Sequence, residues 1–251
     1  MLKKELQKQG DFLFRYRSNF PLLFLVAGMA VFISKTLQAA ESGINFPETY
    51  YMIICVAIAL FGQLIRILTV GFTPVNTSGR NSLKQIADEI NKTGIYSTVR
   101  HPLYVGNFFI WLGLAMITAN VWFVVAFIFL YWVYYERIMY SEEMFLYNKF
   151  GEDYEKWADK TPAFIPSLKR YEKPSLPFSW KKILKKEKNG IAAIFILFFI
   201  FDFISFLLET GRFKFNLEFN FWFYAAVAAT VFYFILKYMK WHTTLLNEPG
   251  R

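Results

Sequence analysis

Cysteine and histidine are scarce in this chain, and that scarcity excludes several kinds of site. The 251 residues include one cysteine, Cys55, and two histidines. One cysteine cannot form a disulfide within the chain, and a metal cluster built from several Cys and His side chains is excluded by the count. The sequence also lacks a glycine-rich phosphate loop, a nucleophile elbow and a zinc-type histidine pair. We therefore expect no metal ion in the functional site.

Apolar side chains, by contrast, are abundant and lie in long runs. Hydrophobic residues make up 55% of the sequence, and Phe alone contributes 30 residues. A helix that crosses a bilayer needs roughly 20 mostly apolar residues. We therefore predict an all-α, polytopic membrane helix bundle of about six transmembrane helices, with spans near residues 20–38, 49–71, 102–119, 121–140, 190–208 and 219–238.

Basic residues are distributed unevenly between these predicted helices. Residues 1–19, 72–101 and 141–189 are rich in Lys and Arg, whereas residues 39–48 contain neither. The positive-inside rule then places both termini and the two long basic loops in the cytoplasm. The net charge of +9 is explained by this topology and by attraction to anionic lipid headgroups, so nucleic acid is not expected as a partner.

Two cytoplasmic segments carry the pattern of surface helices. Ser82 and Gln85 form a capping-box pattern before apolar residues at helical spacing, which predicts a helix that runs through Ile90. Residues 178–188 place apolar side chains among lysines, which predicts a separate interfacial amphipathic helix ahead of the fifth span.

A polar hinge lies at the mouth of the third predicted span. Pro102 disfavours the helical region for His101 and itself suits the first position of a helix. Arg100 and His101 therefore lie in an extended hinge beside an apolar run that begins at Leu103. Taken alone, a snorkelling arginine and an interfacial histidine explain these residues as well as a binding site does.

A second polar cluster returns to the same side of the membrane. The helix that begins near residue 121 continues past the bilayer to Phe150 and carries Glu142 and Glu143 on its extension. Their placement opposite the hinge favours a shared site. The alternative is a solvated helix face on which they pair with Arg137 or Lys149.

Several ionisable residues fall within the predicted spans, and three of them lead to predictions of their own. Arg66 lies in the second span, three residues after Gln63, and an intramembrane arginine is by default a functional hypothesis. Since Arg66 is near the end of its span, snorkelling is the alternative. Asp202 and Lys35 lie at comparable depths toward the outer face, so we also predict that they pair.

Taken together, these clusters resemble the isoprenylcysteine carboxyl methyltransferase family and the related membrane phospholipid methyltransferases. The resemblance covers roughly residues 50–167. The motifs that carry it are Gly94-Ile95-Tyr96, Arg100-His101-Pro102-Leu103-Tyr104-Val105-Gly106, Glu142-Glu143, Phe150-Gly151 with Tyr154, and Thr161-Pro162 with Pro166.

This resemblance implies a methyltransferase that uses S-adenosylmethionine, bound on the cytoplasmic side, and a membrane-embedded lipid or lipidated acceptor. It divides the chain into a basic N-terminal region with the first span (1–48), a methyltransferase-like core (49–167), and a basic linker with two further spans (168–251). The residues that it implies as cofactor contacts are Tyr96, Arg100, His101, Pro102, Leu103, Tyr104, Gly106 and Glu142.

The resemblance also implies a basic residue facing the acceptor about one turn before the acidic pair. Arg137 is near that position, although Ile138 is the residue that precedes Glu142 by four. We therefore predict Arg137, Arg66 and Glu143 as the catalytic residues. An anionic oxygen mainly needs alignment whereas an amine needs a base, so a carboxylate or phosphate oxygen is the expected acceptor.

Other functions remain open at this stage. A phospholipid amine N-methyltransferase fits the same motifs. Nicotinamide-dependent membrane sterol reductases share an Arg-His-Pro-x-Tyr-x-Gly turn, but in them an acidic residue usually follows where this chain has Asn107. A non-catalytic membrane scaffold of the same fold would bind neither nucleotide. The identity of the acceptor and the oligomeric state are not determined by the sequence.

Overall fold

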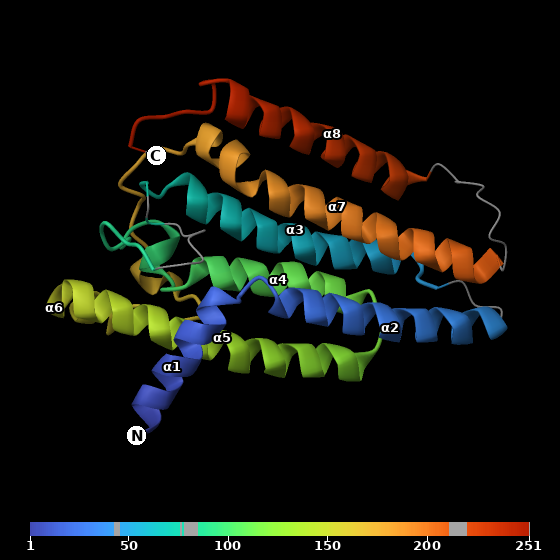
Figure 1. Cartoon of the computed structure of the whole chain (residues 1–251), viewed down its shortest axis with the longest axis horizontal. Helices are drawn as coiled ribbons and strands as arrows, with labels where there is room; N and C mark the ends of the chain where they lie inside the picture. The colour runs from blue at the N-terminus through green and yellow to red at the C-terminus, as the bar shows by residue number, and fades with distance from the viewer. Residues whose placement is uncertain (43–45, 76, 78–84, 211–219, 251) are drawn as a thin grey trace.

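The computed structural model of the chain describes residues 1–42, 46–75, 77, 85–210 and 220–250, and within them it is built from helices without a strand (Figure 1). Two short 3-10 helices lie at Ile95–Ser97 and Leu168–Arg170. The predicted all-α fold is thus confirmed. The α-helices are α1 (Leu2–Arg15), α2 (Phe20–Glu41), α3 (Thr49–Gly71), α4 (Pro102–Met116), α5 (Val121–Phe150), α6 (Glu152–Ala158), α7 (Trp180–Thr210) and α8 (Phe221–His242).

Five of these helices, α2, α3, α5, α7 and α8, are long and apolar enough to cross a membrane. Helix α4 is apolar but has only 15 residues. It is shorter than the predicted span because a turn follows, in which Ala119 has a φ of 43°. A multi-pass membrane bundle is therefore confirmed, but the predicted count of six spans is not.

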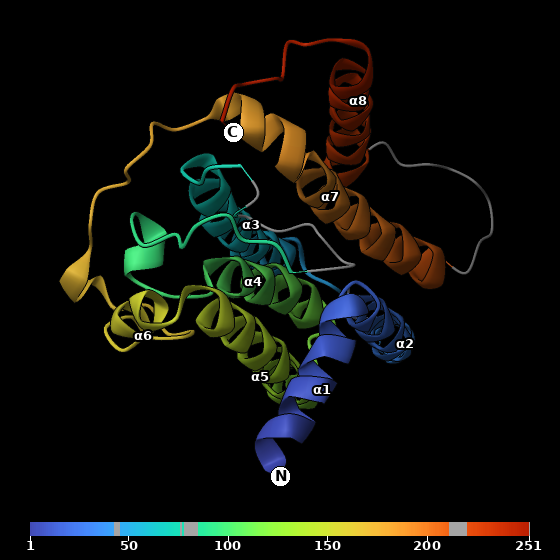
Figure 2. The same ribbon diagram turned by 60° about the vertical axis from the view of Figure 1, so that its left-hand side comes forward.

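The two termini lie at the same end of the bundle (Figure 1). Helix α6 and the segment that leads into α4 lie at this end too, whereas the C-terminal ends of α2 and α7 and the N-terminal ends of α3 and α8 lie at the opposite end. Helix α1, whose pattern the sequence analysis missed, runs across α5 (Figure 2). A Cβ at Gly10 of α1 would lie 2.2 Å from the backbone oxygen of Arg137, so the two helices touch through their backbones.

The buried core has two parts. One joins α2, α3, α4, α7 and α8 around Phe32, Cys55, Phe198 and Trp222. The other is mainly aromatic and joins α1, α4 and α5. Since residues from α7 and α8 belong to the first core, the C-terminal helix pair is packed into the bundle rather than attached to it.

Close packing of α3 on α4 depends on glycines. A Cβ at Gly62 would lie 2.4 Å from the backbone oxygen of Gly106, and one at Gly113 would lie 2.5 Å from that of Cys55. Small residues let two membrane helices approach to backbone contact. This approach fixes the position of the next turn of α3, which carries Arg66.

Two predicted surface helices differ from the structure. Gln85–Ile90 is not helical, and Ser82 lies outside the described residues. Contacts with α5 replace the helix there: Gln85 Nε2 donates to Ser141 Oγ at 3.0 Å, and Lys149 Nζ donates to the backbone oxygen of Ala87. The predicted interfacial helix over 178–188 is instead the first part of the continuous helix α7.

The predicted ion pair between Asp202 and Lys35 is wrong. Asp202 accepts a hydrogen bond from Asn220 Nδ2 at 2.5 Å. Lys35 is exposed on α2, and no ion pair joins it to Asp202 in the described part of the chain. A lysine near the end of a span can keep its charge in water by snorkelling, so it needs no partner.

Candidate functional site

A cavity of about 500 Å³ lies at the end of the bundle that holds both termini. Its lining comes from α3, α4, α5 and α6, from the α1–α2 junction and from the segment that leads into α4. This volume lies within the range of about 300–1,000 Å³ that is typical of small-molecule sites. The predicted site residues that line it are Arg66, Tyr96, Arg100, His101, Pro102, Leu103, Tyr104 and Glu142.

The hinge before α4 has the expected form. His101 is the N-cap, with φ −120° and ψ 59°, and Pro102 is the first helical residue. The backbone nitrogens of Arg100 and His101 donate to the backbone oxygens of Pro162 and Ala163, at 2.9 and 3.2 Å. Residues 162 and 163, which follow α6, therefore fix the backbone of the hinge by hydrogen bonds. This contact explains why the Arg100-His101-Pro102 and Thr161-Pro162 motifs occur together.

His101 lies between two carboxylates. Its Nδ1 is 3.5 Å from Glu142 Oε2, and its Nε2 is 2.9 Å from Glu143 Oε1. Burial alone would lower the pKa of His101, but the hydrogen bonds and negative charges of Glu142 and Glu143 outweigh it and raise the pKa above 6.5. The two carboxylates therefore favour the protonated imidazolium, which donates from both nitrogens, more than the surroundings of an ordinary histidine do.

The two glutamates have different surroundings. Glu142 lines the cavity and accepts a hydrogen bond from the Tyr104 hydroxyl at 2.7 Å. Glu143 is not among the described lining residues, and its Oε1 is 3.1 Å from Arg100 Nε. This is an ion-pair distance without the alignment of a hydrogen bond. Glu143 thus joins α5 to the hinge, whereas Glu142 presents its charge to the cavity.

Arg66 reaches the cavity wall from α3. Its Nη1 donates to Asn107 Oδ1 at 2.7 Å, and its Nε and Nη2 donate to the two oxygens of Glu187, each at 2.9 Å. Arg66 and Asn107 both line the cavity. The alternative of a snorkelling arginine does not apply, because the guanidinium is held inside the bundle.

Two other predicted residues lie away from the lining. Arg137 pairs with its neighbour Glu136 at 2.9 Å and is not among the described residues that line the cavity. Gly106 packs against α3, where a Cβ would lie 2.6 Å from Arg66 Cγ. Its lack of a side chain leaves room for Arg66, so it contributes to the site without lining the cavity.

Sequence reasoning missed several lining residues. Asn91 and Gln85 lie in the non-helical segment before α4, and Arg17 lies at the α1–α2 junction. Tyr135 and Trp111 face the cavity from α5 and α4. Only Arg17 has a sequence feature that could have indicated a site, because it is a basic residue directly before an apolar span. The positive-inside rule explains a basic residue at this position equally well, so no binding role was predicted for it.

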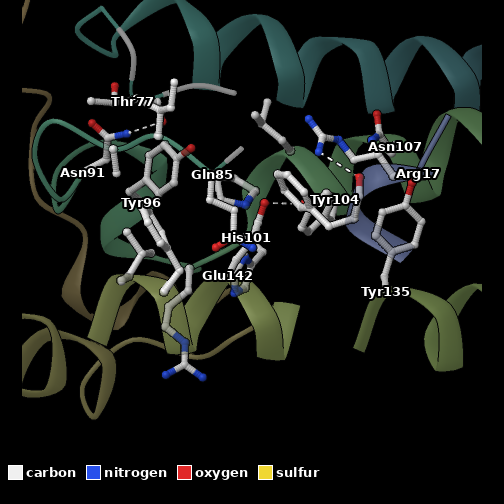
Figure 3. Close-up of a pocket in the computed structure, with 18 of the residues that line it drawn as sticks. Arg17, Thr77, Gln85, Asn91, Tyr96, His101, Tyr104, Asn107, Tyr135 and Glu142 are labelled. Carbon is white, nitrogen blue, oxygen red and sulfur yellow. Dashed lines mark hydrogen bonds and ion pairs between the residues drawn. The ribbon is translucent and has the colours of Figure 1, made fainter. Parts of the chain in front are cut away.

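The cavity has two chemically different ends (Figure 3). Thr77, Asn91 and Tyr96 lie at one end, while Arg17, Asn107 and Tyr135 lie at the other, with His101 and Glu142 between them. We call these the loop end and the arginine end. Ligands at the two ends would meet beside the Glu142 carboxylate and His101 at the middle of the cavity.

Two buried donors in the lining lack a partner. Tyr154 Oη and Trp157 Nε1 are buried, and neither has a hydrogen bond in the described structure. Burial raises the pKa of Tyr154, so its hydroxyl remains a neutral donor. Buried polar groups are normally satisfied, so these two favour a polar ligand in the cavity.

Comparison with known proteins shows a similarity that fits these features. Residues 50–153 match the family described as phospholipid methyltransferase. The matched segment contains α3, α4, α5, the hinge and the Glu142-Glu143 pair, and therefore most of the cavity.

Curated relatives agree with this similarity. The chain is 33% identical over 131 residues to a protein-S-isoprenylcysteine O-methyltransferase of Schizosaccharomyces pombe, which covers 50% of this chain and 53% of the relative. It is 27% identical over 154 residues to the protein of the same name from Xenopus laevis, covering 60% and 53%. The chain thus spans about half the length of these methyltransferase relatives.

A third relative is matched over more of its length. The nickel-cobalt-cadmium resistance protein NccN of Alcaligenes xylosoxydans xylosoxydans is 25% identical over 222 residues, which is 87% of each chain. No group of three or more His, Cys, Asp or Glu side chains that could hold a metal ion occurs among the residues with a described position. No solved structure matches the chain.

Proposed function

We propose that this protein is an S-adenosylmethionine-dependent methyltransferase that methylates an anionic oxygen of a membrane lipid or a lipidated molecule. The observation that carries the proposal is the two-ended cavity. Its middle holds the Glu142 carboxylate beside His101, and its arginine end is lined by residues of α3, α4 and α5 and of the α1–α2 junction. The family match and the methyltransferase relatives favour this function over a nicotinamide-dependent reductase.

Residues from the loop end, the middle and the rest of the lining fit the proposed cofactor. S-adenosylmethionine, when bound, supplies an electrophilic methyl group on a positively charged sulfur. Glu142 offers a carboxylate to a positive charge or to hydroxyl and amino donors. Tyr96 offers a flat apolar face for an adenine ring, and the unpaired donors of Tyr154 and Trp157 can satisfy acceptor atoms.

The arginine end suits an anionic acceptor. Arg66 and Arg17 both line it, so an acceptor carboxylate or phosphate would meet positive charge there. An anionic oxygen needs no base, and the task of the protein is then to align it with the methyl group. His101 is flanked by carboxylates that favour its protonated form, which makes it a poor base for an amine acceptor.

The printed names of the relatives suggest one acceptor chemistry. Protein-S-isoprenylcysteine O-methyltransferases are named for methylation of an oxygen on a lipidated cysteine. We therefore infer a lipidated carboxylate as the first acceptor to test.

Methyl transfer from labelled S-adenosylmethionine tests the proposal. We expect the purified protein in lipid–detergent micelles to label an S-farnesylated cysteine carboxylate, and to leave phosphatidylethanolamine unlabelled, because the arginine end selects an anion over an amine. Base treatment followed by mass analysis distinguishes the two products, because base cleaves a methyl ester and leaves a methylated amine intact. Labelling of the amine lipid alone would replace our proposal with N-methylation, and labelling of neither would contradict it.

We further propose that both termini and the cavity face the cytoplasm. The segments at that end carry most of the Lys and Arg, which would also attract anionic lipid headgroups. Reporter fusions placed after Lys8 and after Gly250 are expected to report the cytoplasm. A fusion after Glu41, at the other end of α2, should report the outside, and the opposite result at any of the three sites would contradict this topology.

A further inference from the structure

A buried polar cluster joins three helices at the arginine end of the cavity. It consists of Arg66 and Gln63 on α3, Asn107 on α4 and Glu187 on α7, and we call it the Arg66 clamp. Glu187 is only 1% exposed. Both of its oxygens accept from the Arg66 guanidinium at 2.9 Å, and Oε2 also accepts from Gln63 Nε2 at 3.0 Å. This paired arrangement is the geometry in which arginine binds a carboxylate most specifically.

The clamp uses every nitrogen of the guanidinium. Nε and Nη2 bind Glu187, and Nη1 binds Asn107. Arginine has a long side chain with many rotamers, so one held at three nitrogens has lost most of its freedom. The side chain is therefore fixed in one orientation at the cavity wall.

Two glycines leave space for the clamp. A Cβ at Gly106 on α4 would lie 2.6 Å from Arg66 Cγ. A Cβ at Gly190 on α7 would lie 2.7 Å from Gln63 Oε1 and 3.8 Å from Glu187 Oε2. Side chains at either position would displace the cluster, so backbone packing as well as hydrogen bonding sets its geometry.

Glu187 comes from outside the segment that matches the family. That segment ends at residue 153, whereas Glu187 lies in the first third of α7. Glu187 does not line the cavity. It nevertheless holds Arg66, which does, so α7 contributes indirectly to the cavity wall.

We infer that Glu187 is a positioning residue for the acceptor, acting through Arg66; this rests on the proposed methyltransferase function. Glu187 holds the guanidinium where an acceptor anion meets it beside Asn107. Without that carboxylate, a buried guanidinium would turn toward another anion, and Glu142 in the same cavity is available. An acceptor displaced by about 1 Å from its productive position can lose about 100-fold in rate.

The test is a double-mutant cycle on Glu187 and Arg66. Glu187→Gln removes the charge at constant shape, and Arg66→Lys keeps the charge but loses the paired geometry. We expect Glu187→Gln to lower kcat for the carboxylate acceptor by about 10- to 100-fold. Cofactor affinity, measured by calorimetry in detergent, should stay at the wild-type value. The double variant should be no slower than the slower single variant, because both changes disable the same contact.

The control is Glu41→Gln, the same chemical change at an exposed position at the far end of α2, which should leave kcat unaltered. Effects that multiply in the double variant, or an equal loss of cofactor affinity and kcat, would overturn the inference. If Glu187→Gln does not fold, Glu187→Asp takes its place, since it keeps the charge but withdraws it by one methylene. Full kcat in that variant would likewise overturn the inference.

The wild type separates the two hypotheses. A wild-type protein that binds no S-adenosylmethionine and labels no acceptor shows that the proposed function fails, and the inference fails with it. An active wild type with a fully active Glu187→Gln variant shows that only the positioning role fails.

Discussion

The Glu142→Ala variant is expected to bind S-adenosylmethionine about tenfold more weakly than the wild type, or worse. A hydrogen bond to a charged group is worth about 1.5–3 kcal/mol, and each 1.4 kcal/mol is about tenfold in affinity. Glu142 is the carboxylate that lines the cavity, and it also holds the Tyr104 hydroxyl at 2.7 Å. The substitution therefore removes a charge and releases the aromatic ring of Tyr104 at the same time.

Titration calorimetry in detergent measures this effect directly. Glu136→Ala is the matched control, because Glu136 is exposed on the same helix and its partner is the neighbouring Arg137. We expect that control to bind the cofactor like the wild type. Equal affinity in wild type and Glu142→Ala, with both folded, would remove Glu142 from the cofactor site.

Replacing Gly62 by Leu should destabilise the protein by at least about 3 kcal/mol, at or beyond the upper end of overpacking effects. A Cβ at this position would meet the backbone oxygen of Gly106 at 2.4 Å and the backbone nitrogen of Ile110 at 2.7 Å. Backbone atoms of a packed helix cannot rotate away as a side chain can. Helices α3 and α4 would have to separate, and Arg66 would then move away from Asn107.

Thermal unfolding in detergent and the yield of folded protein are the measurements. Ala57→Leu, which adds bulk at an exposed position of the same helix, serves as the control and should unfold like the wild type. A Gly62→Leu protein with wild-type unfolding temperature would show that α3 and α4 do not pack through this glycine.

The sequence predicts the positions of helices well where one local pattern, such as a long apolar run, is enough to determine them. Long apolar runs, together with the pattern that continues to Phe150, predict α2, α3, α5 and α8 near their observed positions. Errors arose where tertiary contacts compete with local patterns. The segment at Gln85 has a capping pattern, yet hydrogen bonds to α5 hold it in a non-helical form. The pattern at 178–188 predicts a helix separate from the span at 190–208, yet α7 is continuous through Gly190, where Gln63 occupies the space of the missing side chain.

The site was predictable only in part, for a related reason. Motifs located His101, Tyr104 and Glu142, because the resemblance to the family supplied the pairing of hinge and acidic residues. No pattern within the sequence connects Arg66 to Glu187, which lies 121 positions later. Such contacts are set by the way α3 packs on α7, and periodicity carries no information on which helices become neighbours.

The place of Glu187 in the Arg66 clamp also bears on how this protein could be shortened or recombined. A chain cut after the family segment would retain the hinge and the acidic pair, yet it would leave the Arg66 guanidinium inside the bundle without its carboxylate. Breaking a buried ion pair on one side costs about 3–5 kcal/mol. Replacing α7 and α8 by the corresponding helices of a relative would have the same cost, unless the new helix carries a glutamate at the position of Glu187. The C-terminal pair is therefore not a separable module, because an arginine in α3 depends on its carboxylate.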